Sequence, residues 1–184
     1  AANLVFNGGT LAYTGASVSM DRAITVNISS GAGINVANAA TTLTLTGEVV
    51  RSTSNGSTTI RKTGAGTFEL AGTTDNMFTR VDVLDGTVVL AKASNAGVHA
   101  VGAGEGVLLI SGSLRLAGTG GDQIFNGSGV TVNGGTFDMN GRNETIGFLS
   151  GAGGRVTNTS TVASALSIAN SGSNGYSGTL TDGA

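Results

Sequence analysis

Short segments in which apolar and polar residues alternate recur along the chain. Each copy holds an apolar-x-apolar triplet, two residues, a Gly followed by Thr or Ser, and a second apolar-x-apolar triplet. The clearest copy runs from Val81–Val83 through Gly86 and Thr87 to Val88–Leu90. Because side chains alternate between the two faces of a strand, each triplet buries its outer residues and exposes the middle one. The pattern therefore predicts pairs of short strands joined by sharp turns.

Six copies of this unit begin at residues 4, 26, 60, 81, 107 and 130, so the steps between them are 22, 34, 21, 26 and 23 residues. The copies at 26 and 60 carry one extra turn residue, and Lys62 takes an apolar position in the second of these. The longest step contains another strand-like piece, Leu43–Leu45, and a polar stretch over residues 51–59. After residue 150 the pattern decays, and Leu166–Ile168 and Leu180 continue it weakly.

A step of 21 to 26 residues matches one coil of a solenoid, whose apolar faces are buried only by stacking on neighbouring coils. A helical interpretation fails, because the chain holds 32 Gly and shows no sustained i, i+3, i+4 apolar stripe. An antiparallel sandwich is the main structural alternative. The recurring corner and the absence of Pro favour an all-β fold, a parallel β-helix of about seven to eight rungs without substantial helix.

The repeat also assigns structural roles to individual positions. The Gly-Thr or Gly-Ser pairs are expected to turn the chain, with glycine supplying a positive φ. These corner residues are Gly9, Thr10, Gly66, Thr67, Gly86, Thr87, Gly112, Ser113, Gly135 and Thr136. The outer residues of the triplets are expected to form the core. They are Phe6, Leu11, Phe68, Leu70, Val81, Val83, Val88, Leu90, Leu114, Leu116, Val130, Val132, Phe137 and Met139.

Stacking of equivalent positions predicts two columns of outward-facing residues. The first strands supply Val5, Asn27, Arg61, Asp82, Leu108 and Thr131. The second strands supply Ala12, Asn35, Glu69, Val89, Arg115 and Asp138. The inter-rung charge pairs are then Arg61 with Asp82 and Arg115 with Asp138, about 4.8 Å apart along the axis. Exposed pairs contribute only about 0–1 kcal/mol, so their value is to specify the register.

Three of these outward positions are apolar where a polar residue is expected. They are Val5, Val89 and Leu108. Either the three side chains form a lateral contact strip, or their assignment to the outer face is wrong.

Composition narrows the possible chemistry. The 184 residues include no Cys and one His, which excludes a disulfide framework, a thiolate nucleophile and a multi-His metal site. Nine basic and 11 acidic residues provide no electrostatic footprint for nucleic acid. No apolar run approaches the roughly 20 residues of a membrane-spanning helix. The chain begins Ala-Ala-Asn, with neither initiator Met nor leader, which indicates a processed product or an excised segment.

The search for catalytic residues yields no site. His99 lies between repeat units and is interpreted as a loop residue rather than a general base, because no nucleophile and orienting group accompany it. Polysaccharide-acting enzymes need two or three clustered carboxylates. The acidic candidates are Asp82, Asp85, Asp122, Asp138 and Glu144. Asp85 is expected to form a turn and two others to pair with arginines, so no acidic cluster emerges. We therefore predict neither catalysis, nor a metal, nor a cofactor.

The stretch Thr58–Thr73, TTIRKTGAGTFELAGT, followed by Arg80–Leu90, RVDVLDGTVVL, resembles the passenger-associated β-strand repeat of bacterial autotransporters. The segments Gly129–Gly141, Thr145–Val156 and Tyr176–Gly183 are similar to other parts of such proteins. The resemblance covers about residues 55–183, while residues 1–54 match only the general rung pattern. It implies a right-handed β-helical passenger that is exported to the cell surface as an adhesin, a stalk or a secreted fibre.

Residues 1–184 are thus expected to form one β-helix segment. It comprises a general rung pattern with an extra strand over 1–54, the best-matching repeats over 55–156 and degenerate rungs over 157–184. Neither end shows an obvious cap, although natural solenoids protect their ends. We expect either continuation of the same chain or head-to-tail stacking of copies into a filament.

Three functions remain open at this stage. The first is a structural extracellular scaffold at the outer surface of a bacterium, which the regular, weakly charged rungs favour. The second is an adhesin that binds host protein or glycan through a side face or the loop Arg51–Thr59. The third is a polysaccharide-acting enzyme.

Overall fold

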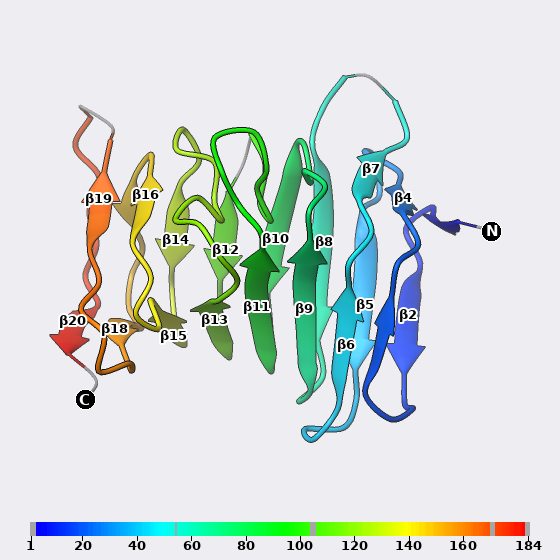
Figure 1. Ribbon diagram of the computed structural model, residues 1–184, viewed down its shortest axis with the longest axis horizontal. Helices are drawn as coiled ribbons and strands as arrows, with labels where there is room; N and C mark the ends of the chain where they lie inside the picture. Colours follow the sequence, from blue (N-terminus) through cyan, green and yellow to red (C-terminus); the bar gives the residue numbers. More distant parts are fainter. Residues whose placement is uncertain (1–2, 54, 104–105, 170–171, 183–184) are drawn as a thin grey trace.

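The chain winds into a parallel β-solenoid of about eight turns, with its first and last coils at opposite ends of the stack (Figure 1). The computed structural model describes residues 3–53, 55–103, 106–169 and 172–182. Over these residues the fold is all-β, without helix, as the repeat predicted. Accordingly, none of the described residues belongs to a helix able to cross a membrane.

Two long sheets form two sides of every coil. The seven-stranded sheet consists of β2 (Thr10–Tyr13), β5 (Ala32–Val36), β8 (Thr58–Thr63), β10 (Thr79–Val83), β12 (Val107–Leu109), β14 (Val130–Val132) and β17 (Leu149–Ser150). The eight-stranded sheet consists of β3 (Val18–Met20), β6 (Thr42–Leu45), β9 (Thr67–Gly72), β11 (Thr87–Lys92), β13 (Ser113–Leu116), β15 (Thr136–Asp138), β18 (Arg155–Asn158) and β20 (Thr179–Asp182). Their strands pair in parallel with the equivalent strands of the next coil.

The remaining side of the coils, which we call the third side, is less regular. A three-stranded sheet begins it, with β1 (Leu4–Phe6), β4 (Ile24–Val26) and β7 (Val49–Arg51). A two-stranded sheet ends it, with β16 (Glu144–Ile146) and β19 (Leu166–Ile168). Between them lie the segments 74–78, 94–101 and 119–126.

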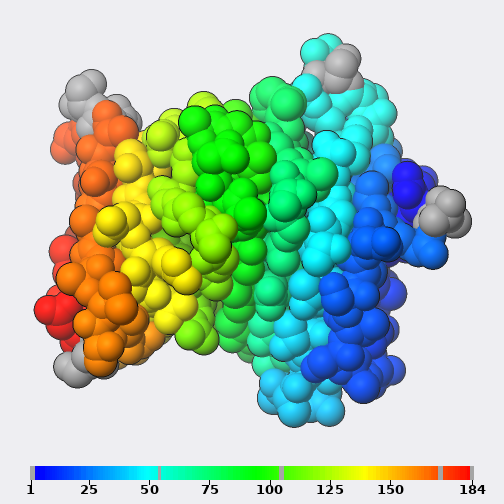
Figure 2. All heavy atoms as spheres, in the orientation of Figure 1, coloured from blue at the N-terminus to red at the C-terminus, as the bar shows by residue number. Residues whose placement is uncertain are grey.

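The core is a continuous apolar column enclosed by the three sides. All residues expected in the core are buried except one. Leu11 is only partly buried, because it lies on β2, which has a paired strand on one side alone. Figure 2 shows the coils packed against each other as successive bands from one end of the molecule to the other.

The first two copies of the repeat lie one side earlier in the coil than the later copies. Residues 4–13 span β1 and β2, whereas residues 81–90 span β10 and β11. The expected columns are therefore wrong for these two copies: Arg61 pairs with Gly33 rather than lying beside Asn27, and Asn35 pairs with Thr63. Glycine turns of similar sequence close two different corners of the coil, so the pattern alone does not identify the corner.

This shift also accounts for the long step in the repeat. Leu43–Leu45 lies on β6 and pairs with both β3 and β9, so it is a regular side of the second coil rather than an extra strand. The polar stretch 51–59 spans the corner between β7 and β8.

The three apolar outward residues do not form a contact strip. Val5 is 59% exposed on β1, whereas Val89 and Leu108 are half-buried on β11 and β12. The three side chains thus face outward from three different sheets. This observation removes the strip hypothesis and retains the assignment to the outer face.

The glycine corners work in two different ways. Gly86, Gly112 and Gly135 adopt φ of 65°, 71° and 71°, in the left-handed region that favours glycine. In contrast, the positive φ of the first and third turns occurs at Gly8 and Gly64, not at the expected Gly9 and Gly66. Gly66 is required for space instead, because a Cβ there would meet backbone oxygens of the preceding coil.

Replacement of a stacked corner glycine should destabilise the protein strongly. We expect Gly135→Ala to cost about 1–2 kcal/mol for the left-handed conformation alone. An additional cost arises because the new Cβ would collide with the Gly112 carbonyl oxygen. Gly9→Ala is the matched control, since a Cβ at that position meets no atom within 4 Å. Urea denaturation of both variants tests this, and equal midpoints would contradict it.

Candidate functional site

The third side departs most from a regular solenoid. Between β7 and β16 its described residues form isolated bridges, such as Val101 with Ile124, rather than a continuous strand ladder. Buried backbone N–H and C=O groups still need partners. Polar side chains therefore gather on this side and replace part of the ladder.

Asn76 connects three successive coils through its side-chain amide. Its Oδ1 accepts the Val49 backbone N–H at 2.9 Å, and its Nδ2 donates to the Ala100 carbonyl at 3.1 Å. The side chain is completely buried. It thus continues the hydrogen bonding of the third side beyond the end of the three-stranded sheet.

Gln123 and Glu144 perform the same task further along the stack. Gln123 accepts the Lys92 backbone N–H at 3.0 Å and donates from Nε2 to the Lys92 carbonyl at 2.7 Å. The Gln123 backbone N–H in turn donates to Glu144 Oε2 at 2.9 Å, and the Ile124 N–H donates to Oε1 at 3.4 Å. Each side chain satisfies backbone groups that a regular strand would otherwise pair.

His99 lies between carboxylates of the coils on either side of it. Its Nδ1 is 3.1 Å from Asp75 Oδ1, which also accepts the His99 backbone N–H at 2.7 Å. Its Nε2 is 3.6 Å from Asp122 Oδ1, beyond hydrogen-bond length but close enough for electrostatic attraction. The ring meets Phe125 edge-on, with centroids 5.4 Å apart. His99 is in a loop, as expected, but its buried imidazole has a structural role that the loop interpretation omitted.

The third side stacks acidic residues that sequence reasoning did not group together. Asp75, His99, Asp122 and Glu144 follow one another at intervals of 24, 23 and 22 residues, which is one coil each. Sequence reasoning named His99, Asp122 and Glu144 but not Asp75, and it did not align them, because all four lie outside the repeat triplets. The coil period itself would have been the signal, since residues one coil apart stack.

Burial raises the pKa of two of these residues, Glu144 and Asp122. It raises the pKa of Glu144 to about 7, and the negative charge of Asp122 adds to the rise, while the backbone N–H donors oppose it. Burial also raises the pKa of Asp122, against the influence of His99. Glu144 is enclosed and bonded to the backbone, so its role is structural. Across the described ranges, no group of three or more His, Asp or Glu side chains is arranged to hold a metal ion.

Both lysines of the chain are fully buried, although lysine is among the residue types that are most costly to bury. Lys62 Nζ donates to carbonyl oxygens at a corner, those of Thr63, Gly64 and Asp85. Lys92 Nζ donates to the Ala71 carbonyl at 2.9 Å. Burial lowers the pKa of each lysine to about 8, partly offset by nearby carboxylates. Lys62 is therefore tolerated at a position that the repeat reserves for an apolar residue, because its amine donates hydrogen bonds to backbone oxygens.

The expected charge pairs lie in adjacent coils and in register. Arg61 Nε is 3.8 Å from Asp82 Oδ2, and Arg115 Nε is 3.8 Å from Asp138 Oδ2. Asp82 has a closer partner in Arg80, at 2.6 Å. These arginines lie half-exposed, so the pairs are weak.

Asp138 contributes more through hydrogen bonds than through its arginine. Its Oδ1 accepts the backbone N–H groups of Asn140 and Thr159, and its Oδ2 accepts the Thr159 hydroxyl at 2.7 Å. Thr159 belongs to the next coil. The carboxylate therefore fastens one coil to another, which sequence reasoning did not anticipate.

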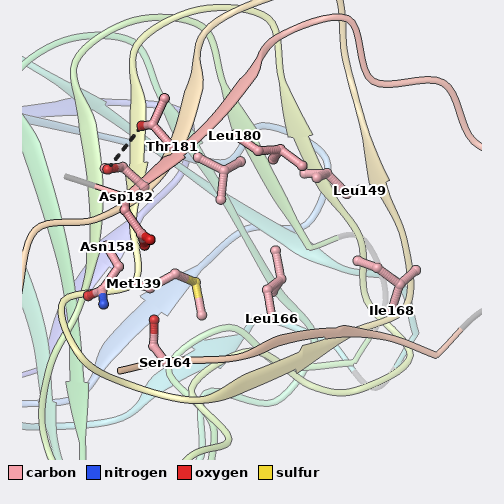
Figure 3. A pocket seen from close by; sticks show the side chains of 11 residues that line it. Met139, Leu149, Asn158, Ser164, Leu166, Ile168, Leu180, Thr181 and Asp182 are labelled. Carbon is pink, nitrogen blue, oxygen red and sulfur yellow. Dashed lines mark hydrogen bonds between the residues drawn. The ribbon is translucent and has the colours of Figure 1, made fainter. Parts of the chain in front are cut away.

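The C-terminal end of the stack is an open apolar pocket of about 430 Å³. Figure 3 shows Leu166, Ile168 and Leu180 around it, with Met139 deeper inside. Ile168 and Leu180 are 50% and 69% exposed, because their inward faces have no coil beyond them. At the other end, four inward side chains of the first coil are only partly buried. They are Leu4, Leu11, Tyr13 and Met20.

These features define the class of protein: a parallel β-solenoid whose third side is held by polar side-chain hydrogen bonds between coils and whose two ends expose apolar side chains. Over 182 aligned residues, covering 97% of the chain, it is 34% identical to the adhesin BmaC autotransporter of Brucella suis biovar 1 (strain 1330). The chain spans 4% of that protein's length. No family model matches the chain, and no solved structure matches it significantly. The fold and this similarity support an autotransporter-related β-helical passenger segment, and they extend the resemblance into residues 1–54.

The buried lysines should make the protein more stable as the pH rises above 8. Between about pH 8 and 10.5 the unfolded chain retains protons that the folded lysines have released, so raising the pH favours the folded state. From pH 8.0 to 9.5 we expect the free energy of unfolding, measured by urea denaturation, to rise by about 1 kcal/mol per lysine.

Lys62→Met should reduce that gain by about half, because it removes one of two such groups. Arg61→Met is the control, since it removes a neighbouring cation that is exposed. A wild-type stability that falls from pH 8.0 to 9.5, or an unchanged slope in Lys62→Met, would contradict the assignment.

Proposed function

We propose that this chain is a non-catalytic structural segment of a bacterial surface or secreted adhesin. Its coils form a stiff stalk, and each end of the stalk extends by coil-on-coil stacking. The observation that carries the proposal is the combination of two uninterrupted parallel sheets with apolar faces at both ends. The similarity to a protein named as an autotransporter adhesin supports a location at the bacterial surface or outside the cell.

The two ends are suited to accept another coil of the same kind. Leu166, Ile168 and Leu180 offer apolar side chains at one end, and β20 offers a strand edge beside them. An unpaired strand edge is a template for a further strand. The occupant is either the next part of a longer chain or a second copy of this one. In the second case the contact is head-to-tail and generates a filament.

Stacking predicts that the purified chain self-associates end to end. Electron microscopy should show filaments with a repeat of about 35–40 Å, which corresponds to seven or eight rungs at about 4.8 Å each. Leu180→Lys should give separate short rods, because it places a charge in the apolar end face.

Met77→Lys is the matched control. Met77 is 53% exposed, but it lies on a corner in the middle of the stack. Its variant should form filaments like the wild type. Separate rods from the wild type at every concentration, or filaments from Leu180→Lys, would refute end-to-end stacking.

A second function, adhesion through the side of the rod, is favoured by one corner. Phe78 and Phe148 directly precede β10 and β17 of the seven-stranded sheet, Phe125 lies in the turn that leads to β14, and all three are outside the buried core. The Arg51 guanidinium carbon lies 3.8 Å from the centroid of the Phe78 ring. With Met77 nearby in sequence, we call these residues the aromatic corner. Aromatic residues, Met and Arg are the types enriched at the centres of protein interfaces.

Adhesion through the aromatic corner is testable by binding to immobilised matrix proteins and glycans. The double variant Met77→Ser and Phe125→Ser should lose at least about tenfold in affinity if the corner contributes central contacts. Val162→Ser is the control, because Val162 is similarly exposed at another place. Absence of wild-type binding, or an equal loss in the control, would reject this second function.

A further inference from the structure

The third side is the part of the solenoid that backbone hydrogen bonds hold least firmly. Its strand ladder is interrupted between β7 and β16, whereas the seven- and eight-stranded sheets run through the same coils without interruption. Segments with fewer ladder bonds open more readily than the rest of a protein. Side chains therefore supplement the scattered backbone hydrogen bonds that cross this part of the third side, such as that from the Ala100 N–H to the Gln123 carbonyl.

Beside the amides of Asn76 and Gln123, four ionisable side chains in consecutive coils connect the third side. Asp75, His99 and Asp122 form a chain of contacts at 3.1 and 3.6 Å across three coils. Glu144 follows in the fourth coil and accepts the backbone N–H groups of Gln123 and Ile124. Asp122 also accepts, at 3.1 Å, a hydrogen bond from the Asn126 amide in its favourable orientation.

We propose that Asp75, His99, Asp122 and Glu144 form a pH-sensitive latch, which keeps the third side closed in mildly acidic solution and lets it open locally as Asp122 and Glu144 ionise. The other charged groups that act on the latch are Lys92, which attracts Asp75, and Glu48, which acts on Lys92. Neither Lys92 nor Glu48 takes over the hydrogen bonds that Glu144 accepts from the backbone.

The direction of the effect follows from the burial of the carboxyl groups. In the closed state the pKa of Glu144 is about 7, and opening returns the group to water, where its ordinary value is 4.5. Between these values the closed state binds more protons than the open state, so raising the pH favours opening. The raised pKa of Asp122 acts in the same direction.

Native-state hydrogen exchange at pH 5.5 and 8.0, corrected for intrinsic exchange rates, tests the latch. The reporters are backbone N–H groups bonded across the third side, those of Asn76, Ala100, Gln123 and Ile124. Their protection should fall by about tenfold or more from pH 5.5 to pH 8.0. Protection in β12 and β14 should fall much less, because neither strand contains an ionisable residue.

Glu144→Gln should flatten this pH profile, since the amide carbonyl still accepts a backbone N–H but does not ionise. Glu69→Gln, the same change on the outward-facing side of β9, is the matched control and should keep the wild-type profile. If Glu144→Gln does not fold, Asp122→Asn serves in its place and should reduce the slope.

Two results would overturn the proposal. The first is equal protection of the wild-type third side at both pH values. The second is a wild-type slope in Glu144→Gln, including the case in which the variant is less protected than the wild type by the same factor at pH 5.5 and 8.0, because that result would show a purely structural bond.

Discussion

The hydrogen bonds between equivalent strands of adjacent coils are the interaction on which this molecule depends. Strands of two to six residues are too short to be stable alone, so each needs the coil above and below it. The close coil spacing also reaches into the corners. Gly112 and Gly135 each lie directly over the carbonyl oxygen of the preceding corner glycine, which leaves no room for a Cβ. The ladder thus dictates both the apolar alternation of the strands and the glycine at the turns.

How far the sequence predicts this fold depends on which side of the coil is considered. Residues 81–90 and 107–116 follow the alternation closely, so their strands, core side chains and register are readable in advance. Residues 4–13 show an equally clear pattern but occupy a different corner, because the turn chemistry of the two corners is the same. Only the pairing of whole coils shows which corner a given copy occupies, and this pairing involves residues far apart in the sequence.

The third side was the least predictable part for a different physical reason. Segments 94–101 and 119–126 have no sustained alternation, since side chains rather than strand ladders connect them to their neighbours. Asn76 and Gln123 resemble ordinary polar loop residues in the sequence. Their burial follows from stacking at the coil period, a relation between residues more than 20 positions apart. The contacts of His99 belong to the same class.

Enclosure of the lysines has a practical consequence for work with this protein. Both lysines lie inside the coils with their amines bonded to carbonyl oxygens, so every side-chain cation that faces outward is an arginine. Acylating reagents, amine cross-linkers and lysine-directed proteases will therefore find no lysine side chain on intact coils. Labelling at Lys62 or Lys92 would report that a coil has unfolded, so the reactivity of these two amines measures whether the solenoid is intact.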